Sequence, residues 1–143
     1  MITNADREVL GETYRNATMA VESIYSVIRK VDDEDLALDL NRQVGKFVAI
    51  SDKAEDELLK AGHWPPEYAM GKVALKAGIM RKTMRDSSCG HIADMLIQGN
   101  TKGIIETTKI LNEHPSAKKT YCEMAEELIA FEQKNIERMK EYL

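Results

Sequence analysis

The segment from Tyr121 to Leu143 constrains the fold most, because its apolar residues recur at spacings of three and four. This spacing places them on one stripe of an α-helix. Glu132 stands in the middle of that stripe, with Asn135 beside it. A carboxylate on the core face of a helix costs free energy unless it is paired or protonated, so we expect a polar group from another helix to face Glu132. The apolar members of the stripe are Tyr121, Met124, Ala125, Leu128, Phe131, Ile136, Met139 and Leu143.

Three other long segments repeat this spacing, and no segment alternates with the period of two that is typical of a strand. The pattern predicts helices near residues 4–31, 33–60, 88–113 and 116–143. Short turns join the first two helices and the last two, which is typical of antiparallel hairpins. Residues 61–87 form the crossover, with a short helix near 69–86. The sequence therefore predicts an all-α fold, a single domain over residues 1–143: a four-helix bundle of two antiparallel hairpins with a long, partly helical crossover.

Capping residues mark where these helices begin and end. Val31 and Leu36 flank the predicted cap of the second helix and would form a hydrophobic staple around it. Gly62 suits the left-handed residue that ends this helix, and Pro115 suits the first turn of the fourth. The predicted N-caps of the first three helices are Thr3 or Asn4, Asp32, and Ser87 or Ser88.

Composition narrows the function classes. The chain carries 20 basic and 24 acidic side chains, a net charge of −4, which argues against nucleic acid as a general partner. Its first ten residues include three charged ones, and no run of about 18 apolar residues occurs, so we expect neither a signal segment nor a transmembrane segment. Cys89 and Cys122 lack metal-ligand spacing, and we expect reduced thiols. These features predict a cytoplasmic protein.

Polar residues on the predicted core faces define a mid-bundle layer: Ser51, Asn100, Glu132 and Asn135. Pairing of the last two helices would bring Asn100 to the depth of Glu132, so we expect a hydrogen bond between them. Burial without a cation should raise the pKa of Glu132. Gly99 and Gly103 should let a neighbouring helix approach closely. The layer is interpreted as a network that fixes helix register; a reduced or single-metal site and a small-ligand pocket are the alternatives.

A resemblance to known proteins supports this architecture. Residues 92–104, which read IADMLIQGNTKGI, look like segments of small bacterial ferritin-like bundles of unknown function. Residues 62–66, which read GHWPP, are similar to the Gly-Trp-Tyr-Pro ending of spore-coat-F-like domains. The ferritin-like superfamily implies a di-iron centre built from Glu and Glu-x-x-His motifs. No Glu-x-x-His surrounds His63, His91 or His114, and only Glu132 and Glu55 remain as weak metal candidates.

The predicted crossover helix carries a cluster of basic residues, which we call the basic segment. We interpret it as a connecting helix, with contact to a membrane surface or a partner as the alternative. Cys89 and His91 lie two apart on a helix and cannot face each other as nucleophile and base, so we expect no enzyme. The basic segment comprises Lys72, Lys76, Arg81, Lys82 and Arg85.

The sequence as a whole favours a non-catalytic bundle with a structural or protein-interaction role, without a cofactor. The resemblance adds a coat-like or stress-related function and a spore-associated location as expectations. A homo-oligomer is a separate expectation. A protein with a reduced carboxylate site that binds iron or manganese is the alternative function.

Overall fold

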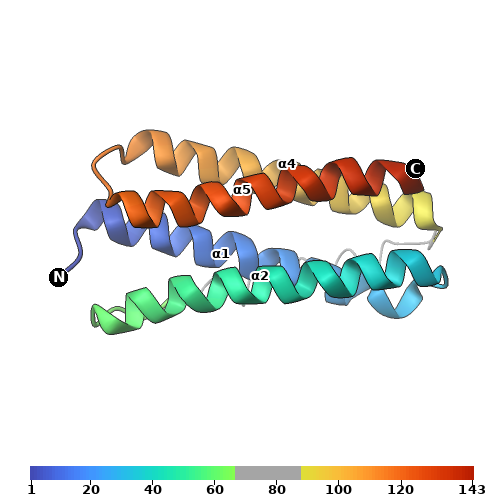
Figure 1. Cartoon of the computed structure of the whole chain (residues 1–143), viewed down its shortest axis with the longest axis horizontal. Helices are drawn as coiled ribbons and strands as arrows, with labels where there is room; N and C mark the ends of the chain where they lie inside the picture. The colour runs from blue at the N-terminus through green and yellow to red at the C-terminus, as the bar shows by residue number, and fades with distance from the viewer. Residues whose placement is uncertain (67–87) are drawn as a thin grey trace.

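The computed structural model describes residues 1–66 and 88–143, and within them every regular element is helical. Four long helices form a bundle, which confirms the predicted all-α class (Figure 1). None of the helices in these two ranges is long and apolar enough to cross a membrane. The elements are α1 (Asn4–Val27), the short helix η1 (Ile28–Lys30), α2 (Glu34–Lys60), α4 (Cys89–Glu113), α5 (Lys119–Met139) and the short helix η2 (Lys140–Tyr142).

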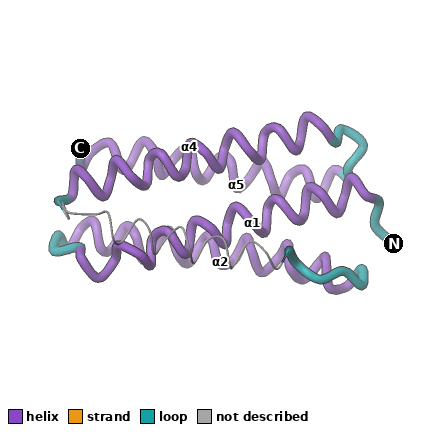
Figure 2. The backbone as a smooth tube through the Cα atoms, turned by 180° about the vertical axis from the view of Figure 1, so that it is seen from behind, coloured by secondary structure: helices purple, strands orange, loops and turns teal. Residues whose placement is uncertain are grey.

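The helices differ in how many neighbours they contact. The chain runs in opposite senses along α1 and α2, and again along α4 and α5 (Figure 1). Seen from behind, α1 lies between α2 and the pair formed by α4 and α5 (Figure 2). Helix α1 packs against all three other long helices, whereas α2 contacts α5 only sparsely. Much of the surface of α1 is therefore buried, and the side of the bundle between α2 and α5 is left more open.

Local capping chemistry explains the beginnings of the first two helices. Thr3 caps α1 as predicted, and Thr3 and Asp6 form a capping box in which each side chain accepts from the other's backbone N–H. The cap of α2 is Asp33, whose carboxylate accepts from the N–H of Leu36 at 2.9 Å, so the prediction of Asp32 was wrong by one residue. The helical segment of α1 and η1 ends at Lys30, one residue before the predicted end, and residues 31–33 form the turn that leads into α2.

The third and fourth helices also depart from simple sequence rules. Ser88 caps α4 as predicted. Helix α5 begins at Lys119, so the prediction that Pro115 lies in its first turn was wrong. The Lys118 side chain does not cap α5; its backbone N–H donates instead to Asp6 of α1 at 2.6 Å. A tertiary contact thus takes the place of a local cap.

The apolar core consists of two clusters along the bundle. One lies toward the α1–α2 turn, where the rings of Phe47 and Phe131 meet edge to face with centroids 4.9 Å apart. The other contains Leu10, Leu58 and Tyr121 and lies at the opposite end. Buried polar side chains from α1, α4 and α5 also lie inside the bundle, and they form the candidate functional site described next.

Candidate functional site

Glu132 is buried in α5, with only 1% of its surface exposed, as its place on the apolar stripe predicted. Its Oε1 accepts a hydrogen bond from Nδ2 of Asn16, on α1, at 2.7 Å. The predicted partner, Asn100, was wrong: its side-chain amide donates to the backbone carbonyl of Leu96 in its own helix at 2.8 Å. The residue that faces Glu132 therefore comes from α1, the helix that contacts all the others.

The Asn16 amide nitrogen lies at the centre of a set of three oxygens. Besides Glu132, it approaches Oγ1 of Thr107 at 2.8 Å and the carbonyl oxygen of Gly103 at 3.2 Å. These acceptors lie on α4 and α5, so one amide group connects three helices. We refer to Asn16, Gly103, Thr107 and Glu132 as the polar centre. Its hydrogen bonds link α1 to both α4 and α5 at one point inside the bundle.

Gly103 gives this centre the space it needs. A Cβ atom built on Gly103 would overlap Oε2 of Glu132 and would lie 2.5 Å from Oδ1 of Asn16. The prediction of a close approach at Gly103 is thus confirmed. The same prediction was wrong for Gly99, where an added Cβ would meet no atom within 4 Å, because that side of α4 faces away from the bundle.

Burial controls the protonation of the centre. It raises the pKa of Glu132 to about 8, although the hydrogen bond from Asn16 acts in the opposite direction; the charge of Glu12 raises it further. The Glu132 carboxyl group is therefore mostly protonated at neutral pH. A protonated carboxyl still offers an oxygen to Asn16 and carries no charge to be desolvated.

Glu12 is a second buried acid that the sequence did not indicate. The three-and-four spacing of the apolar residues in its helix places Glu12 off the core face, yet it is only 6% exposed. Burial is the largest effect and raises the pKa of Glu12 above its ordinary value. The charge of Arg15 lowers this pKa, and the charge of Glu106 raises it. Arg15 pairs with the Glu12 carboxylate at 2.6 Å. The signal that could have identified Asn16 and Glu12 is a second stripe on the same helix, adjacent to the apolar one: Val9, Glu12, Thr13, Asn16 and Ala20.

The other predicted layer residues lie outside the polar centre. Ser51 is buried and donates to the carbonyl of Val48 in its own helix at 3.0 Å. Asn100 and Asn135 are buried, but within the described residues neither side chain hydrogen-bonds to Glu132. Glu55 is partly exposed. The helix period placed most of these side chains inward correctly, but it carries no information about which of them meet.

The metal candidates and the basic segment can be placed only in part. Within residues 1–66 and 88–143, no group of three or more His, Cys, Asp or Glu side chains is arranged to hold a metal ion. Cys89 and Cys122 are both free thiols. The basic segment, Lys72, Lys76, Arg81, Lys82 and Arg85, and the short helix predicted near 69–86 lie outside the described residues.

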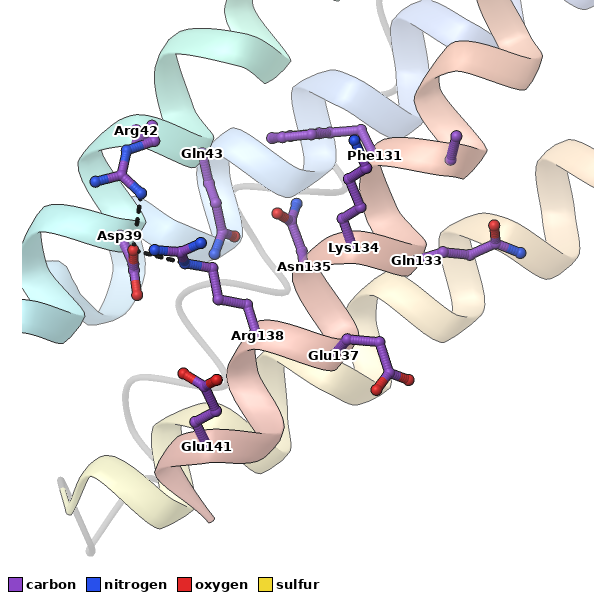
Figure 3. Close-up of a pocket in the computed structure, with 11 residues that line it drawn as sticks. Asp39, Arg42, Gln43, Phe131, Gln133, Lys134, Asn135, Glu137, Arg138 and Glu141 are labelled. Carbon is purple, nitrogen blue, oxygen red and sulfur yellow. Dashed lines mark hydrogen bonds and ion pairs between the residues drawn. The ribbon is translucent and has the colours of Figure 1, made fainter.

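A second polar region lines the open side of the bundle between α2 and α5 (Figure 3). Asp39, buried on α2, is its central acid. Its Oδ1 accepts from Nε of Arg138 at 2.8 Å and from Nη1 of Arg42 at 3.1 Å, and its Oδ2 accepts from the Tyr142 hydroxyl at 2.8 Å. This cluster could not be predicted from local sequence patterns, because it joins residues about 100 positions apart in the chain.

Comparison with known proteins adds no family to this description. No family model matches the chain, and no curated protein or solved structure matches it.

Proposed function

We propose that this chain is a non-catalytic, ferritin-like helical bundle of two antiparallel hairpins, with a structural or protein-interaction role. The observation that carries the proposal is the position of the Asn16 amide nitrogen, 2.7 to 3.2 Å from three oxygens of α4 and α5. The NH₂ group at this point shares its two hydrogens among the surrounding oxygens from within the chain. The centre then serves to fix helix register and leaves the outer faces of the bundle for contacts with other molecules.

The protonation of Glu132 supports the same proposal. A carboxylate that ligates a metal must be ionised, and metal binding therefore competes with protons. Burial favours the neutral form of Glu132, whose pKa is raised to about 8. A neutral carboxyl hydrogen-bonded to an amide suits a structural centre, because it avoids an isolated buried charge.

A specific observation favours a second candidate, a ferritin-like protein with a reduced carboxylate site for iron or manganese. Glu12 on α1 and Glu132 on α5 are both buried and close enough that the charge of one raises the pKa of the other. A divalent cation between two such carboxylates would remove their repulsion and favour the ionised forms. Thr107 and the Gly103 carbonyl would be the additional oxygen donors.

Metal analysis of protein purified without chelator distinguishes the two functions. The structural proposal expects substoichiometric iron and manganese, and no rise in Tm on adding Mn²⁺. Glu132→Gln tests the centre, and Glu126→Gln is the matched control, because Glu126 is exposed on the same helix. Stoichiometric iron or manganese that is lost in Glu132→Gln but kept in Glu126→Gln would overturn the structural proposal.

A further inference from the structure

Helix α2 carries exposed apolar side chains on the face that points away from the bundle. Among its residues, Leu38, Val48 and Leu59 are 61%, 36% and 44% exposed. Their spacing places them within about a quarter turn of each other around the helix, opposite the core residues Phe47 and Leu58. Helix α2 forms one outer edge of the bundle (Figure 1). Single exposed apolar residues are common on protein surfaces, so it is the arrangement of these three that needs a reason.

The arrangement is symmetric along the helix. Val48 and Ala49 lie midway, with Leu38 ten residues before Val48 and Leu59 ten residues after Ala49. A two-fold axis through this midpoint and perpendicular to α2 places a second copy of the helix antiparallel to the first. Leu38 of each copy then faces Leu59 of the other, and the two midpoints meet on the axis. Such a self-complementary surface is what a two-fold dimer requires.

Small residues near the midpoint leave room for a second helix. Gly45 and Ala49 are both exposed on the outward face of α2. A Cβ atom built on Gly45 would meet nothing within 4 Å, so no atom in the part of the chain that the structure describes uses this space. Glycine inside a helix lowers its stability, and the distance between two packed helices depends on the side chains at their contact. A helix from another molecule can therefore approach α2 closely here.

The charges on this face favour the antiparallel arrangement. Arg42 and Asp56 lie at nearly equal distances on either side of the midpoint, so each faces the other residue of the second copy. Asp35 and Lys60 form a second pair of the same kind. All four side chains are exposed and free to reach across. A parallel copy would instead bring Asp56 of one chain beside Asp56 of the other, which is a repulsive contact.

Two lysines of α2 would approach each other in the antiparallel pairing, but a third residue offsets their charge. Lys46 and Lys53 lie on either side of the midpoint. Lys46 pairs with Glu127 of α5 at 2.6 Å. This hydrogen bond lowers the pKa of Glu127, and the charge of Lys53 also acts to lower it. Both ammonium groups therefore lie at the edge of α2 next to α5, beside a carboxylate.

We propose that α2 is the interface of a homodimer, in which the α2 helices of two copies of this chain pack antiparallel about a two-fold axis at Val48 and Ala49. One helix of 27 residues offers a contact about 40 Å long, so the dimer is weak and forms with rising concentration. The inference rests on the proposed interaction role and names its partner. A chain that stays monomeric would overturn the dimer alone, because metal analysis tests the polar centre separately.

Sedimentation equilibrium of the full chain from about 5 to 500 µM tests the dimer. A monomer–dimer equilibrium is expected, and a chain that stays monomeric throughout would overturn the proposal. Leu38→Ser should raise the dimer Kd about tenfold. The matched control is Ile105→Ser, since Ile105 is 47% exposed on α4, and it should leave the Kd unchanged. Equal weakening by both variants would place the contact elsewhere and overturn the assigned surface.

A pair of charged substitutions tests the antiparallel arrangement. Leu38→Lys and Leu59→Glu each put one charge into an apolar contact and should each raise the dimer Kd about tenfold. The double variant should associate about tenfold more tightly than either single variant, because position 38 of one copy faces position 59 of the other. These positions are 21 residues apart in one helix, about 31 Å, and cannot pair within a chain.

Both positions are exposed, so the variants should keep the helical signal of the parent in circular dichroism. Single variants that dimerise like the parent, or a folded double variant that recovers no association, would overturn the antiparallel α2 interface.

Discussion

Replacing Gly103 by alanine tests the geometry of the polar centre most directly. The added methyl group would overlap Oε2 of Glu132 and crowd Oδ1 of Asn16. Both atoms end side chains that could move freely on a surface, but Glu132 and Asn16 are buried and hydrogen-bonded to each other at 2.7 Å. They can make room for the methyl group only by breaking that bond or by shifting α4 away from α1 and α5.

The magnitude follows from three contributions. Alanine in the middle of a helix is worth about 1 kcal/mol of stabilisation over glycine. Overpacking a buried site costs ~1–3 kcal/mol, and losing the hydrogen bond costs ~1 kcal/mol more. We therefore expect Gly103→Ala to destabilise the protein by ~1–3 kcal/mol.

Two other glycines provide the matched control. Gly99 and Gly45 lie inside α4 and α2, and a Cβ atom on either would meet nothing within 4 Å. Gly99→Ala and Gly45→Ala should each stabilise by up to ~1 kcal/mol, a rise in Tm of about 2–4 °C for a chain of this size. Urea unfolding followed by circular dichroism measures all three variants. If Gly103→Ala stabilised the protein as much as Gly99→Ala, the contacts described between α1, α4 and α5 would be wrong.

Three further predictions concern charge. The raised pKa of Glu132 means that its contribution to folding is present below about pH 4.5 and is lost as pH rises toward about 8, because the unfolded chain releases this proton first. Relative to the parent, the free energy of unfolding of Glu132→Gln should increase by on the order of 3–5 kcal/mol between about pH 4 and pH 9. Urea unfolding at several pH values measures this difference, and a difference that does not change with pH would contradict the burial of Glu132. Asp39→Asn should cost ~1 kcal/mol in the same assay, since Arg138 and Tyr142 would keep only a neutral acceptor, and an unchanged midpoint would show that these bonds do not stabilise the fold. If the basic segment only connects the hairpins, vesicles of anionic lipid should not retain the protein at about 0.15 M salt; retention that disappears when its five cations become Gln would instead indicate surface binding.

The sequence by itself determined the helices and several of their ends. The three-and-four spacing and caps such as Thr3 and Ser88 act within a few residues, so they can be read without knowing the neighbours. It also determined that Glu132 is buried, because a residue inside a continuous apolar stripe has no other place to face. The cap at Asp33 shows the limit of this local reading, since Asp32 and Asp33 are adjacent residues of the same capping type and the sequence does not distinguish them.

The tertiary structure alone decided which polar groups meet. Helical periodicity gives the direction of a side chain about its own axis, but not the rotation and offset of one helix against another. Asn16 rather than Asn100 faces Glu132, because α1 packs against both α4 and α5 and Gly103 opens the space between them. The groove between α2 and α5 likewise exists because α2 meets α5 only sparsely, and that relation between distant segments depends on the packing of the whole bundle.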